Sequence, residues 1–206
     1  MNTYLRDFMP RVIVIFSHPR YENSRVHRAL LEVVAPLPMV TIDDLYEEYA
    51  DFHIDIHREQ ERLLAHDVIV WQFPLYVYAP PALLKQWLEL VLEFGWAFGK
   101  GGGRLKGKLG IITVSTGGSR ESYGPEGPHR YPLMAFLRPL ERAIALCGMV
   151  NLPPFVVQGT YRLSDQELQE EAERYRMLME ALSQPLPVDE ISSFLTLNEW
   201  IQRRGT

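Results

Sequence analysis

The chain has 206 residues, of which 47% are hydrophobic and 23% are charged, and its formal net charge is −5. These values are ordinary for a globular protein with a well-packed core, and they exclude a disordered chain. The basic residues are dispersed rather than clustered, which argues against nucleic acid as the partner.

The single cysteine and the N-terminal residues indicate which kinds of protein this chain is not. Because Cys147 is the only cysteine, no intramolecular disulfide can form, and no thiolate-rich metal site or other metal is expected. Met1–Pro10 contains Arg6 and Asp7 without an apolar stretch, so we expect an N-terminal extension over residues 1–10 and not a signal peptide. No window reaches about 18 uninterrupted apolar residues, so membrane insertion is not expected. We therefore expect a soluble, cytoplasmic protein.

Apolar runs alternate with helical patterns through the first half of the chain, which is typical of βαβ units and a parallel sheet. The β-branched run Arg11–Ser17 predicts a strand buried on both faces. A helix is expected over Ser24–Val34, where apolar residues recur at three- and four-residue spacings. The following elements are expected to be a strand over Met39–Ile42, a helix over Ile56–Ala65, a strand over Asp67–Phe73 and a helix over Ala82–Leu92 that Pro80 and Pro81 open.

The second half continues this alternation. We expect a strand over Lys108–Ser115, a helix over Leu133–Leu146 and a short strand over Phe155–Gln158. Ser164 with Glu167 three residues later is the signature of a capping box, and it predicts a long helix over Ser164–Leu182. The prolines that follow end this helix, and residues 184–206 form a C-terminal appendix whose structure the sequence does not predict.

Five strands with intervening helices predict a flavodoxin-like fold, a five-stranded doubly wound parallel α/β sheet with helices on both faces. We place this domain at residues 11–183. Three loops follow the first, third and fourth strands. Because ligands bind at the carboxyl ends of the strands in such a sheet, these loops form the candidate site.

The first of these loops, residues 18–28, suits a phosphate group. Ser24 stands where a helix N-cap belongs, and the free N–H groups of a helix start favour an anion. Arg25 and His18 could add donors to the same anion. Serine at this place is more often only a cap, and neither GxGxxG nor GxxxxGK[ST] occurs, so an ordinary dinucleotide or P-loop site is excluded.

The other two loops suit a flat ring. Pro74–Tyr78 (PLYVY) places aromatics at a strand end, where they could wall an isoalloxazine, although core packing is the alternative. Ser115–Ser119 (STGGS) carries consecutive glycines, which let backbone N–H groups approach a ligand, although a plain turn is the alternative. Such donors could meet the N1/C2=O edge of a flavin.

An ordered set of motifs resembles the flavodoxin-like NAD(P)H:quinone oxidoreductases, and among them the ancillary subunits of bacterial glutathione-gated potassium-efflux systems. The motifs are IFSHP (15–19), WQFPLY (71–76), PALLKQW (81–87), FGWAFG (94–99) and STGG (115–118). The resemblance covers about residues 11–183. It implies a homodimer that transfers two electrons by a ping-pong mechanism, with FMN favoured over FAD because the C-terminal region is short.

The resemblance also implies site residues. The flavin contacts would be His18, Ser24, His27, Leu75, Tyr76, Val77, Tyr78, Ser115, Thr116, Gly117 and Gly118, to which the loop arguments add Arg25 and Pro74. Tyr123 and His129 match a tyrosine and a histidine that stabilise charge on the flavin in related quinone reductases, which makes them candidate catalytic residues. A solvated loop is the alternative for His129.

Trp96 and Phe98 are candidate substrate-binding residues that could cap a planar acceptor, or else fill a subunit contact. The resulting hypothesis is an enzyme in which NADH or NADPH reduces FMN and a quinone or another planar acceptor then takes the electrons. A flavodoxin-like electron carrier is one alternative. The other is a regulatory subunit bound to the cytosolic domain of a potassium-efflux antiporter, and so peripheral to the inner membrane.

Overall fold

The computed structural model describes residues 9–204 of the chain. Of the N-terminal extension predicted over residues 1–10, all but Met9 and Pro10 lies outside the described residues. No helix between residues 9 and 204 combines the length and the apolarity needed to cross a membrane.

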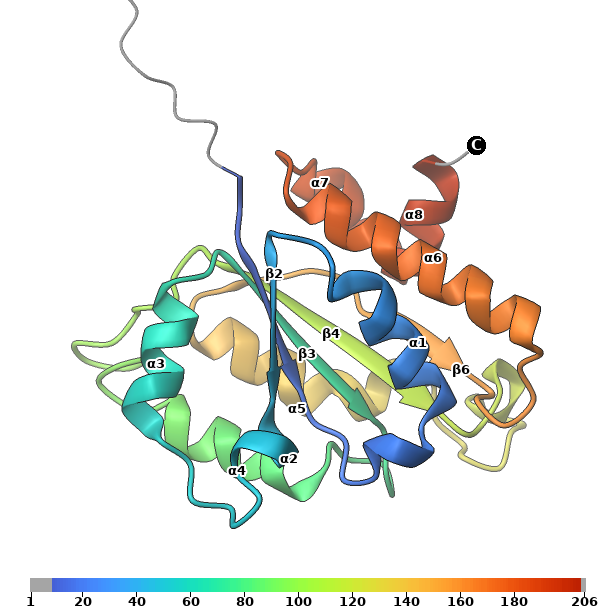
Figure 1. Ribbon diagram of the computed structural model, residues 1–206, viewed down its shortest axis with the longest axis horizontal. Helices are drawn as coiled ribbons and strands as arrows, with labels where there is room; N and C mark the ends of the chain where they lie inside the picture. The colour runs from blue at the N-terminus through green and yellow to red at the C-terminus, as the bar shows by residue number, and fades with distance from the viewer. Residues whose placement is uncertain (1–8, 205–206) are drawn as a thin grey trace, which may run out of the picture.

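A parallel sheet forms the centre of the molecule (Figure 1). Its strands are β1 (Val12–Phe16), β2 (Val40–Asp44), β3 (Val68–Pro74), β4 (Leu109–Thr116), β5 (Val150–Asn151) and β6 (Phe155–Gln158). The order is β2-β1-β3-β4, with β5 and β6 pairing one after the other along the free edge of β4. The short segment between them contains Pro153 and Pro154, which have no N–H to donate to a ladder. The six strands thus fill five positions in the order 2-1-3-4-5, and the predicted flavodoxin-like sheet is confirmed.

Helices cover both faces of this sheet, as predicted. They are α1 (Arg25–Val34), α2 (Leu45–Glu48), α3 (Ile56–Leu64), α4 (Ala82–Val91), α5 (Leu133–Leu146), α6 (Asp165–Leu182), α7 (Val188–Ile191) and α8 (Leu197–Arg204), with 3-10 turns η1 (Tyr21–Asn23) and η2 (Arg120–Ser122). One core cluster lies between the sheet and α3, α4 and α5 and holds Trp71 and Trp87. The other lies beneath α1, α6 and α8 and holds Phe16 and Tyr175 (Figure 1).

Most predicted elements coincide with the observed ones within one or two residues. The helix over Leu133–Leu146 and the strand over Phe155–Gln158 have the predicted bounds. The capping box at Ser164 and Glu167 is formed in both directions. The second strand runs two residues further than predicted, to Asp44. Helix α2 and strand β5 were not predicted.

Residues 184–206, left without a structural prediction, contribute α7 and α8 to the described chain. Ile191, Leu197 and Trp200 are buried in the same core cluster as α1 and α6. The side chain of Asn198 pairs with the outer edge of β6, because its Oδ1 accepts from the Val156 N–H at 2.8 Å and its Nδ2 donates to the Val156 carbonyl at 3.0 Å. Helix α8 therefore covers the backbone of an edge strand.

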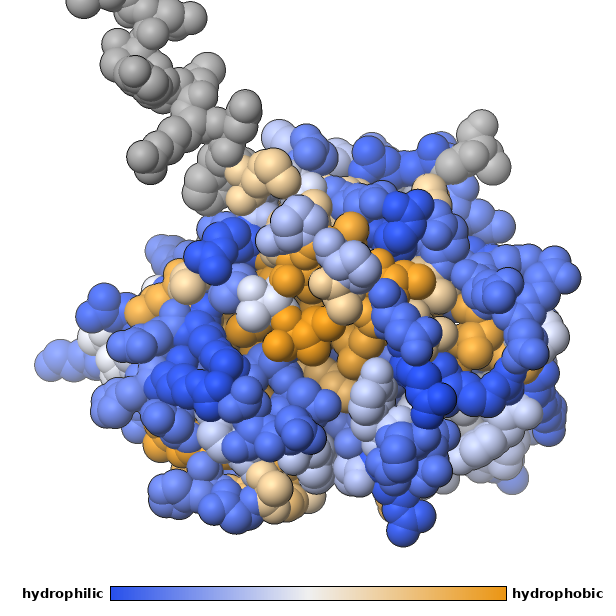
Figure 2. Space-filling model, viewed as in Figure 1, coloured by the Kyte–Doolittle hydropathy of each residue, from blue (hydrophilic) through white to orange (hydrophobic). Residues whose placement is uncertain are grey.

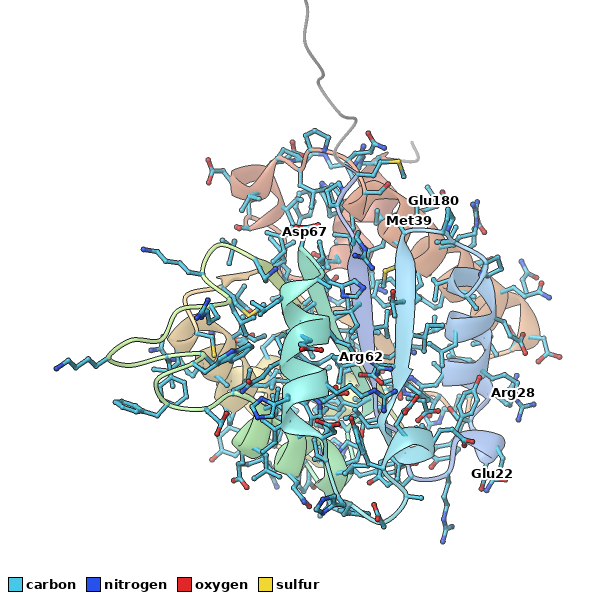
Figure 3. The ribbon with its side chains drawn as sticks, turned by 60° about the vertical axis from the view of Figure 1, so that its left-hand side comes forward. Glu22, Arg28, Met39, Arg62, Asp67 and Glu180 are labelled. Carbon is cyan, nitrogen blue, oxygen red and sulfur yellow. The ribbon has the colours of Figure 1, made fainter. Side chains whose placement is uncertain are left out.

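The opposite edge of the sheet is β2. Figure 2 shows apolar side chains gathered around it between α3 and α1, where Leu37, Val40 and Ile42 are partly buried. Beside this patch, Arg62 of α3 reaches β2 and pairs with the buried carboxylate of Asp43 (Figure 3). Glu59 on the same helix accepts hydrogen bonds from Tyr49 and Trp87. Burial, and after it the nearby Asp43, raises the pKa of Glu59 above its usual value.

Candidate cofactor-binding site

A cavity of about 830 Å³ opens at the carboxyl ends of β1, β3 and β4. The structure therefore brings together the three loops that the sequence singles out. The predicted residues that line it are His18, Ser24, Arg25, Pro74, Leu75, Tyr76, Val77, Tyr78, Ser115, Gly117, Gly118, Tyr123 and His129. The predicted residues His27 and Thr116 do not line it, and Trp96 and Phe98 lie elsewhere.

The first loop presents the start of α1 to the cavity. Ser24 caps the helix, because its Oγ accepts from the His27 N–H at 3.1 Å. The N–H groups of Arg25 and Val26 precede any carbonyl that could accept from them within the helix, so they remain available to an anion. The Arg25 guanidinium itself is paired with Asp165 at 2.6 Å. Arg20, which the sequence reasoning missed, lines the cavity and has no ion pair within the described chain.

His18 lies in this loop as a neutral imidazole. Its Nδ1 accepts from the Arg20 N–H at 3.1 Å, so the ring proton belongs on Nε2. Nε2 faces the Tyr76 hydroxyl at 3.5 Å. Burial lowers the pKa of His18 below its usual value. His18 thus contributes a neutral hydrogen-bonding edge and not a second positive charge.

His27 lies behind the cavity wall in a buried chain of hydrogen bonds. The Tyr175 hydroxyl donates to Gln72 Oε1 at 2.7 Å, and Gln72 Nε2 faces His27 Nδ1 at 3.2 Å. Since the Gln72 amide must donate to Nδ1, the His27 proton is on Nε2, which lies 2.8 Å from Ser115 Oγ. The Ser115 hydroxyl then keeps its own proton for a ligand. Burial lowers the pKa of His27 to about 3, so the imidazole is neutral.

The second loop is a tight turn from Tyr76 to Ala79. The N–H of each of these two residues donates to the carbonyl of the other at 3.0 Å. Val77 has a φ of 47° and Tyr78 a φ of 66°, which makes this a type I′ turn. A β-branched residue is strained in that region. The N–H groups of Val77 and Tyr78 donate to no carbonyl in the described chain, and both residues line the cavity.

The third loop is fixed by hydrogen bonds to the carbonyl of Gly118. Thr116 Oγ1 donates to it at 2.7 Å and the Gly159 N–H at 2.9 Å. Thr116 is thus a buried support of the loop and not part of the cavity wall. A Cβ at Gly117 would lie 2.7 Å from the Tyr161 ring, and one at Gly118 would lie 2.9 Å from His129 Nε2. A side chain at Gly117 would therefore displace the exposed Tyr161 ring, and one at Gly118 would displace the His129 ring.

Tyr123 and His129 form one aromatic cluster at the end of the cavity. Their rings stack with centroids 4.4 Å apart. The Tyr78 hydroxyl lies 3.2 Å from His129 Nδ1, which connects this cluster to the second loop. Burial raises the pKa of Tyr123, so its hydroxyl keeps its proton and can donate it in a hydrogen bond.

Trp96 and Phe98 are not in the cavity. Phe98 lines a neighbouring apolar groove of about 590 Å³ between α4 and α5, which shares Leu75 and Tyr78 with the cavity wall. Trp96 packs against the core cluster beneath these helices and lines neither space. The segment that carries both residues is thus adjacent to the candidate site without facing into it.

The sequence reasoning missed several lining residues. Arg20 and Asn23 lie within the predicted first loop, and the basic side chain was the signal that could have identified Arg20. Thr160 and Tyr161 follow β6, the next strand along the sheet edge. The topological rule that selected the other three loops applies equally to this one.

The lining residues fit FMN. The start of α1 and Arg20 suit a phosphate. The exposed turn and the glycine pair offer backbone N–H donors in a cavity that aromatic side chains line. The two glycine positions leave room that a Cβ would occupy. The volume lies within the range of small-molecule and cofactor sites.

The comparisons with known proteins agree with this geometry. A family model described as a flavodoxin-like fold matches residues 10–178. The chain is 42% identical to a glutathione-regulated potassium-efflux system ancillary protein, KefG, of Pectobacterium carotovorum, over 88% of this chain and 97% of the relative. General stress protein 14 of Treponema denticola, solved in complex with FMN, superposes with a TM-score of 0.80 at 35% identity, over 84% and 99% of the two chains. An NADPH-quinone reductase from P. pentosaceus superposes with a TM-score of 0.75 at 26% identity, over 85% and 99%.

Proposed function

The chain belongs to the family with the flavodoxin-like fold, and from this premise we propose that it is an FMN-dependent NAD(P)H:quinone oxidoreductase. The observation that carries the proposal is the convergence of three loops from β1, β3 and β4 on one cavity with the donor set of a flavin site. A relative solved with FMN and another named NADPH-quinone reductase support the cofactor and the class of reaction.

Each loop has its own part in this proposal. The N–H groups at the start of α1, with Arg20, hold the phosphate. The N–H groups of Val77 and Tyr78 would donate to the ring, and Gly117 and Gly118 would let the backbone approach it closely. The Ser115 hydroxyl, oriented by His27, adds a side-chain donor.

The remaining groups serve the transfer itself. Bound FMN supplies the capacity to accept a hydride from NADH or NADPH and to pass it to a quinone. The Tyr123 hydroxyl and the His129 imidazole stabilise the charge that develops next to them, as a phenol donor and a proton buffer. In this proposal the donor and the acceptor bind to the same open cavity in turn, which would make the mechanism ping-pong.

A flavin titration followed by anaerobic reduction tests the proposal. The protein is expected to bind one FMN per chain, and NADH or NADPH is expected to bleach it directly. In a matched pair, Gly118→Val is expected to weaken FMN binding because its side chain forces the rings of His129 and Tyr123 into the space that the ligand would occupy, whereas Gly124→Val, whose Cβ meets nothing within 4 Å, should retain it. A folded protein that binds no FMN would overturn the cofactor assignment. If the protein binds FMN but neither NADH nor NADPH reduces it, the result would instead support the alternative of a flavodoxin-like electron carrier.

A second role is favoured by the relative from Pectobacterium. Its name describes an ancillary protein of a potassium-efflux system, and the chain covers 97% of it. We propose that the reductase also associates with the cytosolic domain of an antiporter, which would bring it to the inner face of the membrane. Co-purification with such a domain tests this role, and a reductase that stays separate at micromolar concentrations of both proteins would contradict it.

A further inference from the structure

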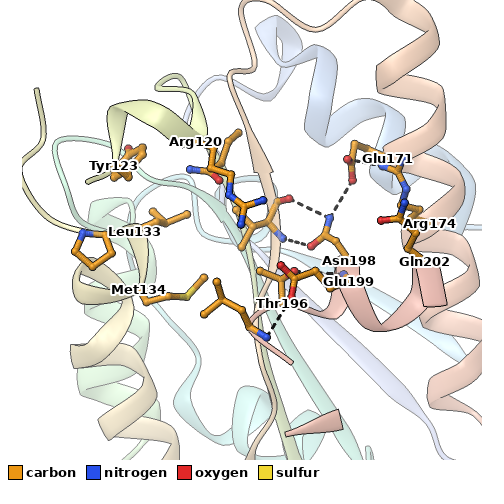
Figure 4. Close-up of a pocket in the computed structure, with 14 residues that line it drawn as sticks. Arg120, Tyr123, Leu133, Met134, Glu171, Arg174, Thr196, Asn198, Glu199 and Gln202 are labelled. Carbon is orange, nitrogen blue, oxygen red and sulfur yellow. Dashed lines mark hydrogen bonds and ion pairs between the residues drawn. The ribbon is translucent and has the colours of Figure 1, made fainter. Parts of the chain in front are cut away.

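A second cavity lies at the β6 edge of the sheet, outside the site described above. Its volume is about 460 Å³. Figure 4 shows Arg120 and Tyr123 of the η2 loop and Met134 of α5 on one side of it, and Asn198 and Gln202 of α8 on the other. Residues from five separate parts of the chain thus enclose it.

Several polar groups in this cavity are already satisfied by one another. Asn198 pairs with the Val156 backbone and donates to Glu171 Oε2 at 2.9 Å. Glu171 also binds Arg174 at 2.5 Å. Glu199 Oε2 accepts from the Leu195 N–H at 3.3 Å. These contacts build the wall of the cavity. Arg174 compensates the charge of Glu171, whereas Glu199 accepts only a backbone N–H and has no cation partner among residues 9–204.

Besides the Glu199 carboxylate, the polar groups that remain are one guanidinium and two amides. The Arg120 side chain makes no ion pair or hydrogen bond within residues 9–204, and neither do the Gln158 and Gln202 side chains. A guanidinium without a carboxylate partner is suited to a phosphate, which it can bind through two parallel hydrogen bonds. Arg120 is therefore the cation in this cavity that can still bind an anion, with the Glu199 carboxylate elsewhere in the lining.

Part of the cavity lining is apolar. It consists of Leu133, Met134, Val156 and Leu195, which we call the apolar slot. An apolar slot flanked by amides suits a heteroaromatic base, because the flat faces contact the aliphatic side chains while the ring edge pairs with the amides. A base attached to a phosphate group would meet both the slot and Arg120.

Tyr123 lines both this cavity and the cofactor site, so the two cavities are neighbours. A ligand in the second cavity could therefore extend past Tyr123 into the first. NADH and NADPH have this form, with a nicotinamide at one end, a diphosphate in the middle and adenosine at the other end.

We propose that the second cavity binds the adenosine diphosphate part of the nicotinamide donor, with Arg120 on the diphosphate and the base in the apolar slot. This inference rests on the proposed function, since it assigns a seat to the donor of that reaction. A quinone would not use Arg120, because it carries no phosphate. The acceptor therefore shares only the nicotinamide end of the donor site.

Calorimetry with ADP-ribose tests the cavity without any turnover, because this probe has the adenosine and the diphosphate but no nicotinamide. The FMN-loaded protein is expected to bind it, and Arg120→Gln should weaken binding about 10-fold through the loss of a charge-assisted contact. Gln202→Glu should weaken it about 5-fold and Gln202→Lys should strengthen it, because the added charge lies in the same cavity as the phosphates. Arg138→Gln is the matched control, since Arg138 on α5 is exposed, pairs with Glu141 and lines neither cavity.

Anaerobic stopped-flow reduction then links the cavity to the donor. In Arg120→Gln the concentration of NADH or NADPH for half-maximal reduction should rise about 10-fold. Reduction by reduced nicotinamide mononucleotide, which lacks adenosine, should be unchanged. This split separates a seat for the adenosine end from a general disturbance of the flavin site.

Three results would overturn the inference. Wild-type protein that does not bind ADP-ribose, or that binds it as tightly as Arg120→Gln does, would show that the cavity is no nucleotide site. If Arg120→Gln weakens reduction by NADH or NADPH and by reduced nicotinamide mononucleotide equally, Arg120 would act at the flavin site and not on the adenosine end. AMP that binds at Arg120 and alters reduction by the mononucleotide would indicate a free regulatory nucleotide. Failure of every nicotinamide to reduce FMN would instead contradict the proposed function, while calorimetry would still report on the cavity.

Discussion

His27 is completely buried, and its hydrogen bonds to Gln72 and Ser115 require the neutral ring. Burial lowers its pKa to about 3, whereas a histidine in an unfolded chain titrates near 6.5. Below pH 6.5 the unfolded state therefore binds the additional proton, so the free energy of unfolding falls as the pH drops from 6.5 towards 3. At pH 5 the free energy of unfolding is about 2 kcal/mol lower than at neutral pH because of this histidine.

Replacing this histidine should remove that dependence. Urea denaturation of His27→Gln is expected to show a free energy of unfolding that falls less steeply between pH 6.5 and pH 5 than that of the wild type. His57→Gln serves as the control, because His57 is exposed on α3. Equal slopes for the wild type and His27→Gln would mean that the buried ring does not stay neutral.

Tyr123 and His129 can be tested as a pair, because their rings are stacked. Tyr123→Phe and His129→Gln should each slow reduction of FMN about 10-fold or more, as expected for groups that stabilise or exchange a proton. Because both act on one developing charge, the double variant should lose less than the product of the two effects. FMN affinity should hardly change, since neither residue is needed to seat the cofactor.

Anaerobic stopped-flow measurements report this step without product release. Tyr131→Phe is the matched control, because Tyr131 is 62% exposed in the same loop and lines neither cavity. If both single variants reduce FMN at the wild-type rate, Tyr123 and His129 have only a structural role in the loop.

The turn after β3 shows strain at the scale of a single element. Val77 is 91% exposed, so no packing contact rewards its φ of 47°. Asparagine adopts this conformation more readily than a β-branched residue does. Val77→Asn is therefore expected to raise the free energy of unfolding by about 1 kcal/mol. Val77→Ile keeps the β-branch and should not raise the free energy of unfolding. A gain of the same size in both variants would mean that side-chain contacts, and not backbone strain, cause the effect.

The elements that could be predicted from sequence are those set by local signals. The bounds of α5 follow from Pro132 before its first turn and from its apolar periodicity, and those of α6 from its capping box. Strand β2 runs past its prediction because Asp43 is buried against Arg62, a partner on α3 that no local pattern reveals. Helices α7 and α8 are short and follow two prolines, so their burial depends on a tertiary contact with α6 and β6.

The candidate site divides in the same way. The topology of a parallel sheet predicts which loops meet, so most lining residues could be named from sequence. Neither the position of His27 behind Ser115 nor the role of Thr116 could be predicted, because their partners come from β3, α6 and the β4 loop. The second cavity is invisible for the same reason, since its walls span residues 120–202.

At the scale of the whole molecule, the apolar groove between α4 and α5 is the expected contact of a homodimer. Leu146 at its rim is 56% exposed and Phe94, beside the Trp96–Phe98 segment, is 72% exposed. Exposed apolar side chains that gather on one surface are typical of an interaction site. Leu146→Asp should therefore shift the protein towards a monomer.

Light scattering measures this shift. Leu64→Asp is the matched control, because Leu64 is likewise the last residue of its helix and is 44% exposed, but lies on α3 away from the groove. A wild type that is already monomeric at working concentrations would remove the dimer, and so would equal behaviour of the two variants.

The contact of Asn198 with Val156 affects whether the edge strand β6 can pair with a strand of another chain. An open edge strand can recruit a strand from another chain and so begin aggregation. At β6 the amide of Asn198 takes up the N–H and the carbonyl of Val156, which are then closed to an incoming strand. A chain ending at residue 196 would lose this amide together with the buried Trp200. We expect such a chain to form turbid, concentration-dependent aggregates, whereas Asn198→Gln, with the same amide on a longer stem, should remain clearer. The last helix thus protects the sheet from uncontrolled growth across its edge.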